Sequence, residues 1–166
     1  MQIGSPRNDQ RSRSKAGDSA RHCGQTCVVA GAKNRKIVLE SLTSRVWAIP
    51  IESPGVLGQV DAGARSGSPR SWPISALLAT IPQPAAPDGM CVDLAGNLLI
   101  SAHNAGVVSV HAPDGTALSQ ITVEDRRLTN CCFGGSDMQT LYITESGLGR
   151  VVTARWERPG LPLHDH

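Results

Sequence analysis

The sequence Ala86-Pro87-Asp88-Gly89-Met90-Cys91-Val92-Asp93 combines a turn tripeptide, residues 87–89, with a short apolar run. Three further apolar runs follow, and turn residues that include a glycine separate each run from the next. None of these runs is long enough, or periodic enough at 3.6 residues, to favour a helix. The segment therefore predicts a four-stranded meander with strands near 90–92, 98–102, 107–110 and 117–123.

Two other parts of the chain carry a related pattern. The motif E-S-x-x-x-R-V at residues 40–46 recurs at residues 145–151. The starts of the first strands also fall in register, which makes Gln25, Asp88 and Thr129 equivalent positions. Four-stranded units of about 40 residues are the signature of a β-propeller, whose blades pack around a central channel. We therefore predict an all-β propeller with about three four-stranded blades.

Composition suggests where these blades begin and end. Residues 1–22 are polar, basic and almost without apolar side chains, so we expect a disordered basic tail. Residues 23–166 form the predicted partial propeller, in which 52–75 is a long loop rich in Gly, Pro, Ser and Arg, and 157–166 is a tail. The predicted blades lie at about 24–81, 87–123 and 128–156.

Charge and hydropathy restrict the kinds of partner. The formal net charge of +2 over 166 residues is too small to indicate nucleic acid or an anionic membrane as a partner. No apolar run approaches the roughly 18 residues of a membrane span, and the amino end lacks the apolar stretch of a secretory signal. We expect a cytoplasmic protein. Aromatic residues are 3% of the chain, so Val, Leu, Ile and Ala must form the core.

The cysteines do not indicate a disulfide framework. Their number is odd, their spacing fits no metal motif, and four of the five fall inside predicted strands, where buried thiols are common. A zinc site built on Cys23 and Cys27 is the alternative, and it would need two further ligands. The remaining three cysteines of the chain are Cys91, Cys131 and Cys132.

Propeller geometry predicts where function resides. If each first strand starts at the channel, the second strand returns to the same face, so Gln25, Asp88 and Thr129 ring the axis on that face. The loops after the second strands flank this ring, and they contain Ser41, His103-Asn104 and Ser146.

Asp88 is the leading site residue, because a carboxylate at a channel mouth can bind a hard cation or act as a general base. The alternative is a simple turn former, as expected for the same tripeptide at 113–115. Gln25 offers an amide oxygen to the same cation, or is a polar loop residue. His103 and Asn104 either contact a polar substrate or form a solvent-facing turn. Glu145 ends a predicted strand on the same face, and we interpret it as a surface carboxylate.

Several segments resemble, in order, the carboxyl-terminal part of the senescence marker protein/gluconolactonase family, which includes regucalcin. The resemblance covers about residues 86–164, is weaker over 24–51 and does not extend to 1–22. Its motifs are P-D-G-M-C-V-D at 87–93, T-N-C-C-F-G-G at 129–135, T-L-Y-I-T-E-S at 140–146 and P-G-L-P-L at 159–163.

The resemblance implies a six-bladed propeller that holds one divalent cation on its axis and hydrolyses sugar lactones. It makes Asp88 a metal ligand and the favoured general base, with calcium the first candidate metal and zinc or manganese the others. A family Asn ligand falls near Gln25, and a family Glu ligand has no counterpart. The expected function is a metal-dependent lactonase, a hydrolase of a cyclic ester.

The number of blades leaves an alternative open. Three blades cannot close a ring of four to eight and leave unpaired strand edges. We therefore expect either a truncated member of the family or a non-catalytic propeller fragment. Such a fragment would bind a cation or a protein partner, or self-associate through its open sheet edges.

Overall fold

The computed structural model describes residues 29–30, 34–58 and 76–162 of the chain. The expected basic tail at 1–22, Gln25 and most of the predicted 52–75 loop lie outside these residues. The described residues contain strands and turns and no α-helix. Accordingly, among them there is no helix with the length and hydropathy needed to cross a membrane.

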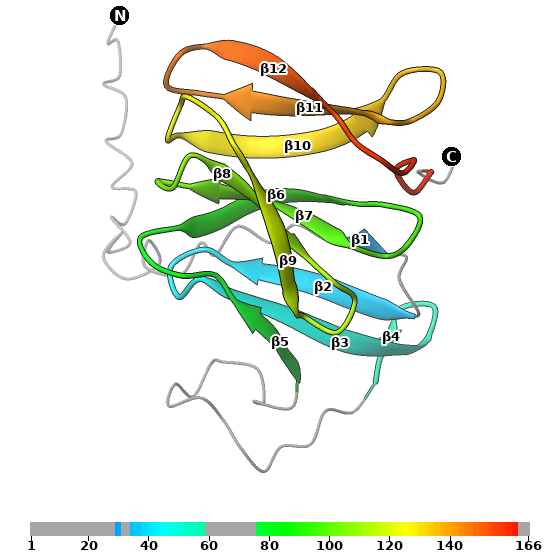
Figure 1. Cartoon of the computed structure of the whole chain (residues 1–166). Coiled ribbons are helices and arrows are strands. Elements are labelled where there is room, and N and C mark those ends of the chain that lie inside the picture. The colour runs from blue at the N-terminus through cyan, green and yellow to red at the C-terminus, as the bar shows by residue number, and fades with distance from the viewer. Residues whose placement is uncertain (1–28, 31–33, 59–75, 163–166) are drawn as a thin grey trace, which may run out of the picture.

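The strands form three antiparallel sheets that follow one another along the chain (Figure 1). In the first sheet the order is β1-β2-β3-β4, and β5 also pairs with β3. The second sheet has the order β6-β7-β8-β9, and the third has the order β10-β11-β12. The strands are β1 (Val29–Ala30), β2 (Arg35–Glu40), β3 (Arg45–Ser53), β4 (Val56–Leu57), β5 (Leu77–Thr80), β6 (Ala86–Val92), β7 (Leu98–His103), β8 (Val107–His111), β9 (Ala117–Thr122), β10 (Leu128–Gly134), β11 (Thr140–Glu145) and β12 (Arg150–Arg155).

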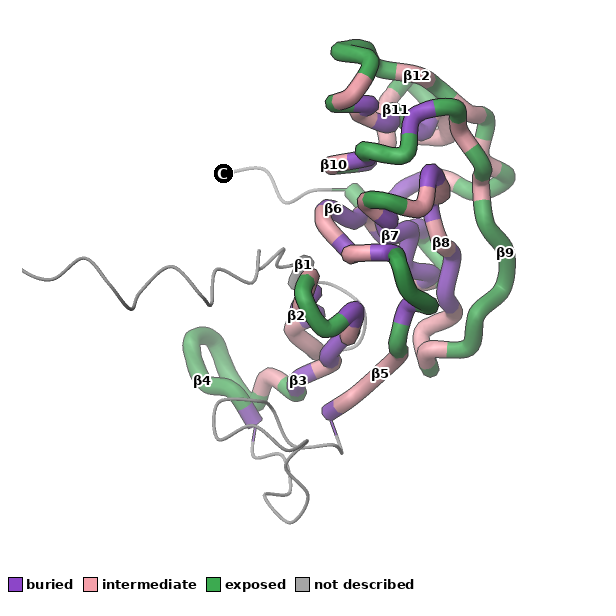
Figure 2. The backbone as a smooth tube through the Cα atoms, turned by 90° about the vertical axis from the view of Figure 1, so that its left-hand side faces the viewer, coloured by how far each residue is buried: buried purple, intermediate pink, exposed green. Residues whose placement is uncertain are grey.

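The sheets lie side by side as blades, with β1, β6 and β10 along one edge of the stack and β9 at the opposite edge (Figure 2). Strand β7 of the middle sheet is buried on both faces. Leu98 and Ile100 of β7 belong to the apolar core shared with the first sheet, whereas Leu99 between them belongs to the core shared with the third. This alternation is what a strand between two neighbouring sheets requires. As expected, aliphatic side chains dominate both cores.

Strand pairing supports the repeat register inferred from the sequence. Val29 pairs with Ile37, Val92 with Leu98 and Phe133 with Leu141. In each unit the paired residue of the first strand comes four positions after the equivalent residue 25, 88 or 129. The residue before each third strand also has a positive φ, which turns the chain back into the sheet. These residues are Ser44, Gly106 and Gly149, with φ of 57°, 72° and 62°.

One local prediction was wrong, because the tripeptide 87–89 lies inside β6 and does not form a turn before it. Pro87 pairs with Ala102 and Met90 with Ile100, so Asp88 and Gly89 together face one residue of β7 in a β-bulge. The second copy, Pro113-Asp114-Gly115, does form a turn between β8 and β9. There Asp114 Oδ1 accepts the Thr116 N–H at 2.9 Å.

The segment after β12 returns to the opposite end of the sheets, away from the bulge. Gly160 forms a bridge with Asp93, and the Leu161 N–H donates to the Val92 carbonyl at 2.8 Å. The Asp93 side chain is fully buried and accepts hydrogen bonds from Asn97 and from Trp156 Nε1. This carboxylate therefore fastens the end of β6 and is committed to structure.

Candidate active site

Loops from all three sheets gather at the end where β6 and β10 begin. The Asn104 N–H donates to the Arg126 carbonyl at 2.7 Å, and the Ser146 N–H donates to the Arg127 carbonyl at 2.9 Å. Ser41 Oγ donates to the Pro87 carbonyl at 2.6 Å. The loops predicted to flank the ring therefore do lie at one end of the molecule, which we call the Asp88 end.

Asp88 sits on the β6 bulge at this end. Bulges re-aim a side chain and are common beside active sites, because the extra residue is released from the regular alternation of the strand. The side chain is half-buried. Loss of hydration raises the pKa of the Asp88 carboxyl above its ordinary value, and the neighbouring charge of His103 partly lowers that pKa.

His103 ends β7 directly opposite the start of β6, where it pairs with Ala86. Its Nδ1 lies 2.9 Å from the carbonyl oxygen of Leu128. A carbonyl only accepts, so Nδ1 carries the proton in this contact and Nε2 is left for another partner. His103 thus touches the third sheet while its charge acts on Asp88 of the second. Asn104, the next residue, is exposed and holds φ of 70° in the turn.

A second bulge lies beside the first. In β10 the register shifts between Leu128 and Asn130, so Thr129 is the extra residue, at the position equivalent to Asp88. Its hydroxyl lies 2.7 Å from Thr144 Oγ1, and Thr144 Oγ1 also accepts the Asn130 N–H at 2.8 Å. The two bulges touch, since a Cβ placed on Gly89 would lie 2.1 Å from Asn130 Oδ1.

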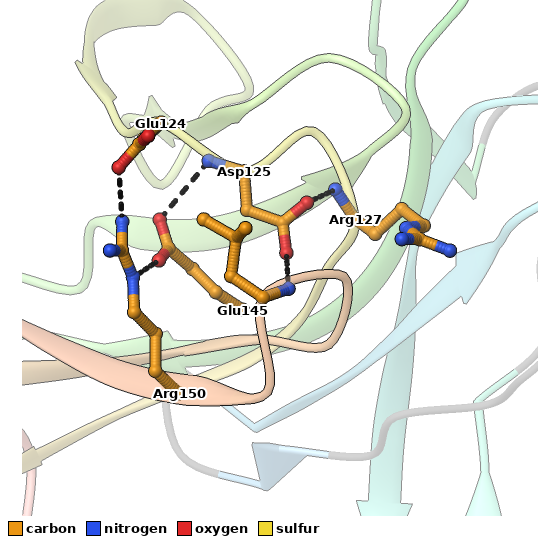
Figure 3. Close-up of polar contacts among 6 residues, drawn as sticks. Glu124, Asp125, Arg127, Glu145 and Arg150 are labelled. Atoms are coloured by element: carbon orange, nitrogen blue, oxygen red, sulfur yellow. Dashed lines mark hydrogen bonds and ion pairs between the residues drawn. The ribbon is translucent and has the colours of Figure 1, made fainter.

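Glu145 is not a surface carboxylate, contrary to the expectation from the sequence. It is 1% exposed and accepts a hydrogen bond from the Asp125 N–H at 3.2 Å (Figure 3). Arg150 bonds to it and also to Glu124 at 2.6 Å. The Asp125 carboxylate in turn accepts the N–H groups of Arg127 and Leu148. This polar cluster joins the β9–β10 connection to the β11–β12 turn and shapes the rim of the Asp88 end.

The repeated motif E-S-x-x-x-R-V is the sequence signal for this cluster. The spacing of five residues between Glu145 and Arg150 recurs between Glu40 and Arg45. In the first sheet, however, Glu40 Oε2 accepts the Trp47 Nε1 hydrogen at 3.1 Å. The repeated acid is therefore the anchor of a turn in both sheets. The contact of Asn130 with Gly89 and that of Thr144 with Thr129 were not predicted, although the repeat register made Asn130 the equivalent of Gly89.

The donors at the Asp88 end fit a hard cation in kind but not in number. Calcium takes six to eight oxygen ligands, with carboxylates among them. Asp88 supplies one carboxylate, while the Thr129 hydroxyl is engaged with Thr144 and Asn130 Oδ1 accepts the Cys131 N–H. Within the part of the chain that the structure describes, no group of three or more His, Cys, Asp or Glu could hold a metal. These residues do not complete a cation site on their own.

Comparison with known proteins identifies the family. The sequence pattern of the SMP-30/Gluconolactonase/LRE-like region matches residues 26–147. The chain belongs to this family. Regucalcin of Danio rerio is 38% identical over 74 residues, which are 44% of this chain and 25% of the relative. Pentonolactonase XacC of Haloferax volcanii is 39% identical over 64 residues, or 39% of this chain and 22% of the relative.

A solved structure supports the fold of the family. The calcium-binding protein regucalcin of Agrobacterium tumefaciens superposes with a TM-score of 0.60 at 14% identity, covering 77% of this chain and 44% of that chain. The predicted all-β propeller of the lactonase type is confirmed, and the described residues supply three of its sheets. The matched segments span about a quarter of the length of the curated relatives named above.

Proposed function

We propose that this chain takes part in the hydrolysis of a small sugar lactone, with Asp88 as the general base and as one ligand of a divalent cation. The observation that carries the proposal is the position of Asp88. It lies on a bulge of an inner strand, half-buried, beside His103, at the end where the loops of all three sheets meet. Membership of the SMP-30/gluconolactonase family supports lactone hydrolysis as the reaction in which this carboxylate acts.

The environment of Asp88 suits proton transfer. A general base works best when its pKa approaches the working pH, and burial moves the pKa of this carboxyl in that direction. The charge of the nearby His103 lowers the pKa of Asp88 and so limits this rise. Burial therefore raises the basicity of Asp88, and His103 opposes that increase.

In the proposed reaction, Asp88 accepts a proton from a water molecule as the water oxygen attacks the lactone carbonyl. The tetrahedral species then collapses, the bond between the carbonyl carbon and the ring oxygen breaks, and the ring oxygen takes back the proton that Asp88 accepted, which restores the carboxylate. The product is an open-chain hydroxy acid. His103 Nε2 and the Asn104 side chain are proposed to bind the sugar hydroxyls, since both residues flank the bulge at the same end.

The cation is proposed to be calcium, with zinc and manganese as alternatives. Its other ligands must come from outside the described residues, and Gln25 is the proposed contributor from this chain. No step of the reaction above depends on the cation. Binding of the cation to Asp88 can be measured separately from turnover, and this measurement tests whether Asp88 is a ligand.

The chain offers a matched control for Asp88, because Asp114 stands in an identical Pro-Asp-Gly tripeptide in an exposed turn. Asp88→Asn is expected to lower kcat for a sugar lactone by about a hundredfold or more, the usual worth of a general base. Asp114→Asn is expected to match the wild type. Calcium affinity, measured by calorimetry, should fall only in the Asp88 variant. Equal turnover in the two variants would refute the role of Asp88.

A second candidate function rests on the outer edge of β12. The third sheet has three described strands where the second has four, and Val151 and Thr153 of β12 are exposed. We propose that a second copy of the chain can pair along this edge. Sedimentation analysis should then give a dimer that Thr153→Pro converts to monomer, since the Thr153 N–H faces the open edge and proline cannot donate to a strand ladder. A monomer at all concentrations would exclude the pairing.

A further inference from the structure

Two cysteines on neighbouring sheets face each other across the core. Cys91 lies on β6 and Cys131 on β10, and their sulfur atoms are 3.7 Å apart. Both belong to the apolar cluster between the second and third sheets, where Cys131 is buried and Cys91 is partly buried. At this separation the two sulfur atoms are in direct contact, with no other group between them.

We propose that Cys91 and Cys131 form a reversible disulfide that cross-links the second sheet to the third. A disulfide requires a sulfur separation of about 2.05 Å, so the two atoms must approach from 3.7 Å through side-chain rotation shared between them. The hydrogen bond from Cys131 Sγ to the Leu99 carbonyl, at 3.2 Å, is weak and is given up in the process.

The reaction balances with a low-molecular-weight disulfide as oxidant. The thiolate of one cysteine attacks the external disulfide and releases one thiol. The second cysteine then attacks the mixed disulfide and releases the other thiol. Two S–H bonds are lost and one S–S bond forms in the protein, while the oxidant is reduced to two thiols. Excess thiol reverses both steps.

The cross-link would act beside the candidate site. Gly89 of β6 contacts Asn130 of β10, and these residues lie two positions from Cys91 and one from Cys131. Oxidation therefore ties together the two bulged strands that carry Asp88 and Thr129. Because the bond joins residues 40 apart in the sequence, it also restricts the unfolded chain. This inference does not depend on lactone hydrolysis.

Cys132, next to Cys131 in the sequence, does not face Cys91. It is exposed and pairs across the ladder with Tyr142, so it faces away from Cys91. In the full chain carrying C23S, C27S and C132S, only the proposed pair remains. After incubation with oxidised glutathione and blocking of free thiols, trypsin should release residues 71–126 joined to residues 128–150, a product that dithiothreitol separates.

The oxidised form should unfold at a temperature higher by about 10 °C than the reduced form. The further change C91S should abolish both the joined peptide and the difference in unfolding temperature. Three results would overturn the proposal. These are free thiols at both positions after oxidation, dimers linked through one cysteine of each chain, and a joined peptide that appears only after denaturation.

Discussion

Ser41 Oγ donates a hydrogen bond of 2.6 Å to the carbonyl oxygen of Pro87, so a turn of the first sheet holds the strand residue next to Asp88. The two residues are 46 positions apart in the sequence, and the contact is partly buried. The neighbouring turn residue Ser44 bonds to the Ala85 carbonyl just before β6. The first sheet thus positions the bulge that the second sheet presents.

Replacing Ser41 by alanine should loosen this bulge. We expect Ser41→Ala to cost about 0.5–1.5 kcal/mol of the free energy of unfolding, since the partly buried Pro87 carbonyl loses the hydrogen bond from Ser41. Turnover of a sugar lactone should also fall, because Asp88 is less firmly placed. Urea unfolding and steady-state kinetics measure the two effects.

Ser146→Ala is the matched control, since Ser146 is the equivalent residue of the repeat and donates to the Arg127 carbonyl at 2.8 Å. That carbonyl keeps the Ser146 N–H as a second donor, and the site is exposed. The control should therefore lose less stability and no activity. Similar losses of activity in both variants would contradict a specific link between Ser41 and Asp88.

Most strands were predictable, because their patterns are local. The apolar runs of β7 and β8 and the turns around them appear directly in the sequence, and the repeat register followed from matched letters. The bulge was not predictable in the same way. Pro87-Asp88-Gly89 and Pro113-Asp114-Gly115 are identical as letters, and only the first lies against a paired strand whose register leaves room for an extra residue.

The sequence predicted that Asp88 and Thr129 lie at the same end of the sheets, but it did not predict their contacts. Repeat register brought Asp88 and Thr129 to one end, but the engagement of Thr129 with Thr144 depends on a second bulge. Burial of Glu145 depends on Asp125, 20 residues away, and on Arg150. Such contacts arise from tertiary packing, which local pattern does not encode.

The contact between the two bulges can be tested at Gly89. A Cβ added there would lie 2.1 Å from Asn130 Oδ1 and 2.7 Å from Asn130 Cα, so rotating the Asn130 side chain alone cannot make room. Gly89→Ala should cost about 1–3 kcal/mol of unfolding free energy, as overpacking usually does. Thermal unfolding measures the loss.

Gly149→Asn serves as the comparison for this glycine. Its φ of 62° suits asparagine, and no atom lies within 4 Å of the place that an added Cβ would take. Near-wild-type stability is expected there. Adding Asn130→Gly to Gly89→Ala should recover part of the loss, because the side-chain clash disappears and the backbone clash remains. Full recovery, or none, would mean that the sheets do not meet as described.

The effect of the His103 charge on the pKa of Asp88 predicts how activity depends on pH. Asp88 must be ionised to accept a proton, so activity should be lost as pH falls through its pKa. The His103 charge lowers that pKa against the effect of burial. Consequently His103→Gln should shift the acid limb of the kcat/KM profile to higher pH, whatever it does to substrate binding.

Arg126→Gln is the control for the His103 variant, since it also removes a positive charge from the Asp88 end. Arg126 bonds to the Asn104 carbonyl through Nε and Nη2 at 3.1 and 2.9 Å. The acid limb of this variant should stay at the wild-type pH. An unchanged limb in His103→Gln would show that the histidine charge does not act on the base.

The polar cluster of Figure 3 predicts how stability changes in acid. Backbone N–H groups, that of Arg127 first, lower the pKa of Asp125 below its ordinary value. The folded state therefore binds the proton less readily than the unfolded state. The carboxylate stabilises the fold at pH values above its unfolded pKa of about 3.9, and this contribution is lost as pH falls through the lower folded pKa.

Asp125→Asn should consequently lower Tm at pH 7, because an amide offers one acceptor where Arg127 and Leu148 each present an N–H. The difference in Tm between the variant and the wild type should start to shrink as pH falls below about 4, where the unfolded chain takes up the proton, and should be smallest below the folded pKa of Asp125. Glu157→Gln, at an exposed position, should change Tm little at either pH. If Asp125→Asn lowered Tm equally at pH 7 and pH 3, the negative charge of Asp125 would not contribute to holding the β9–β10 connection against the β11–β12 turn.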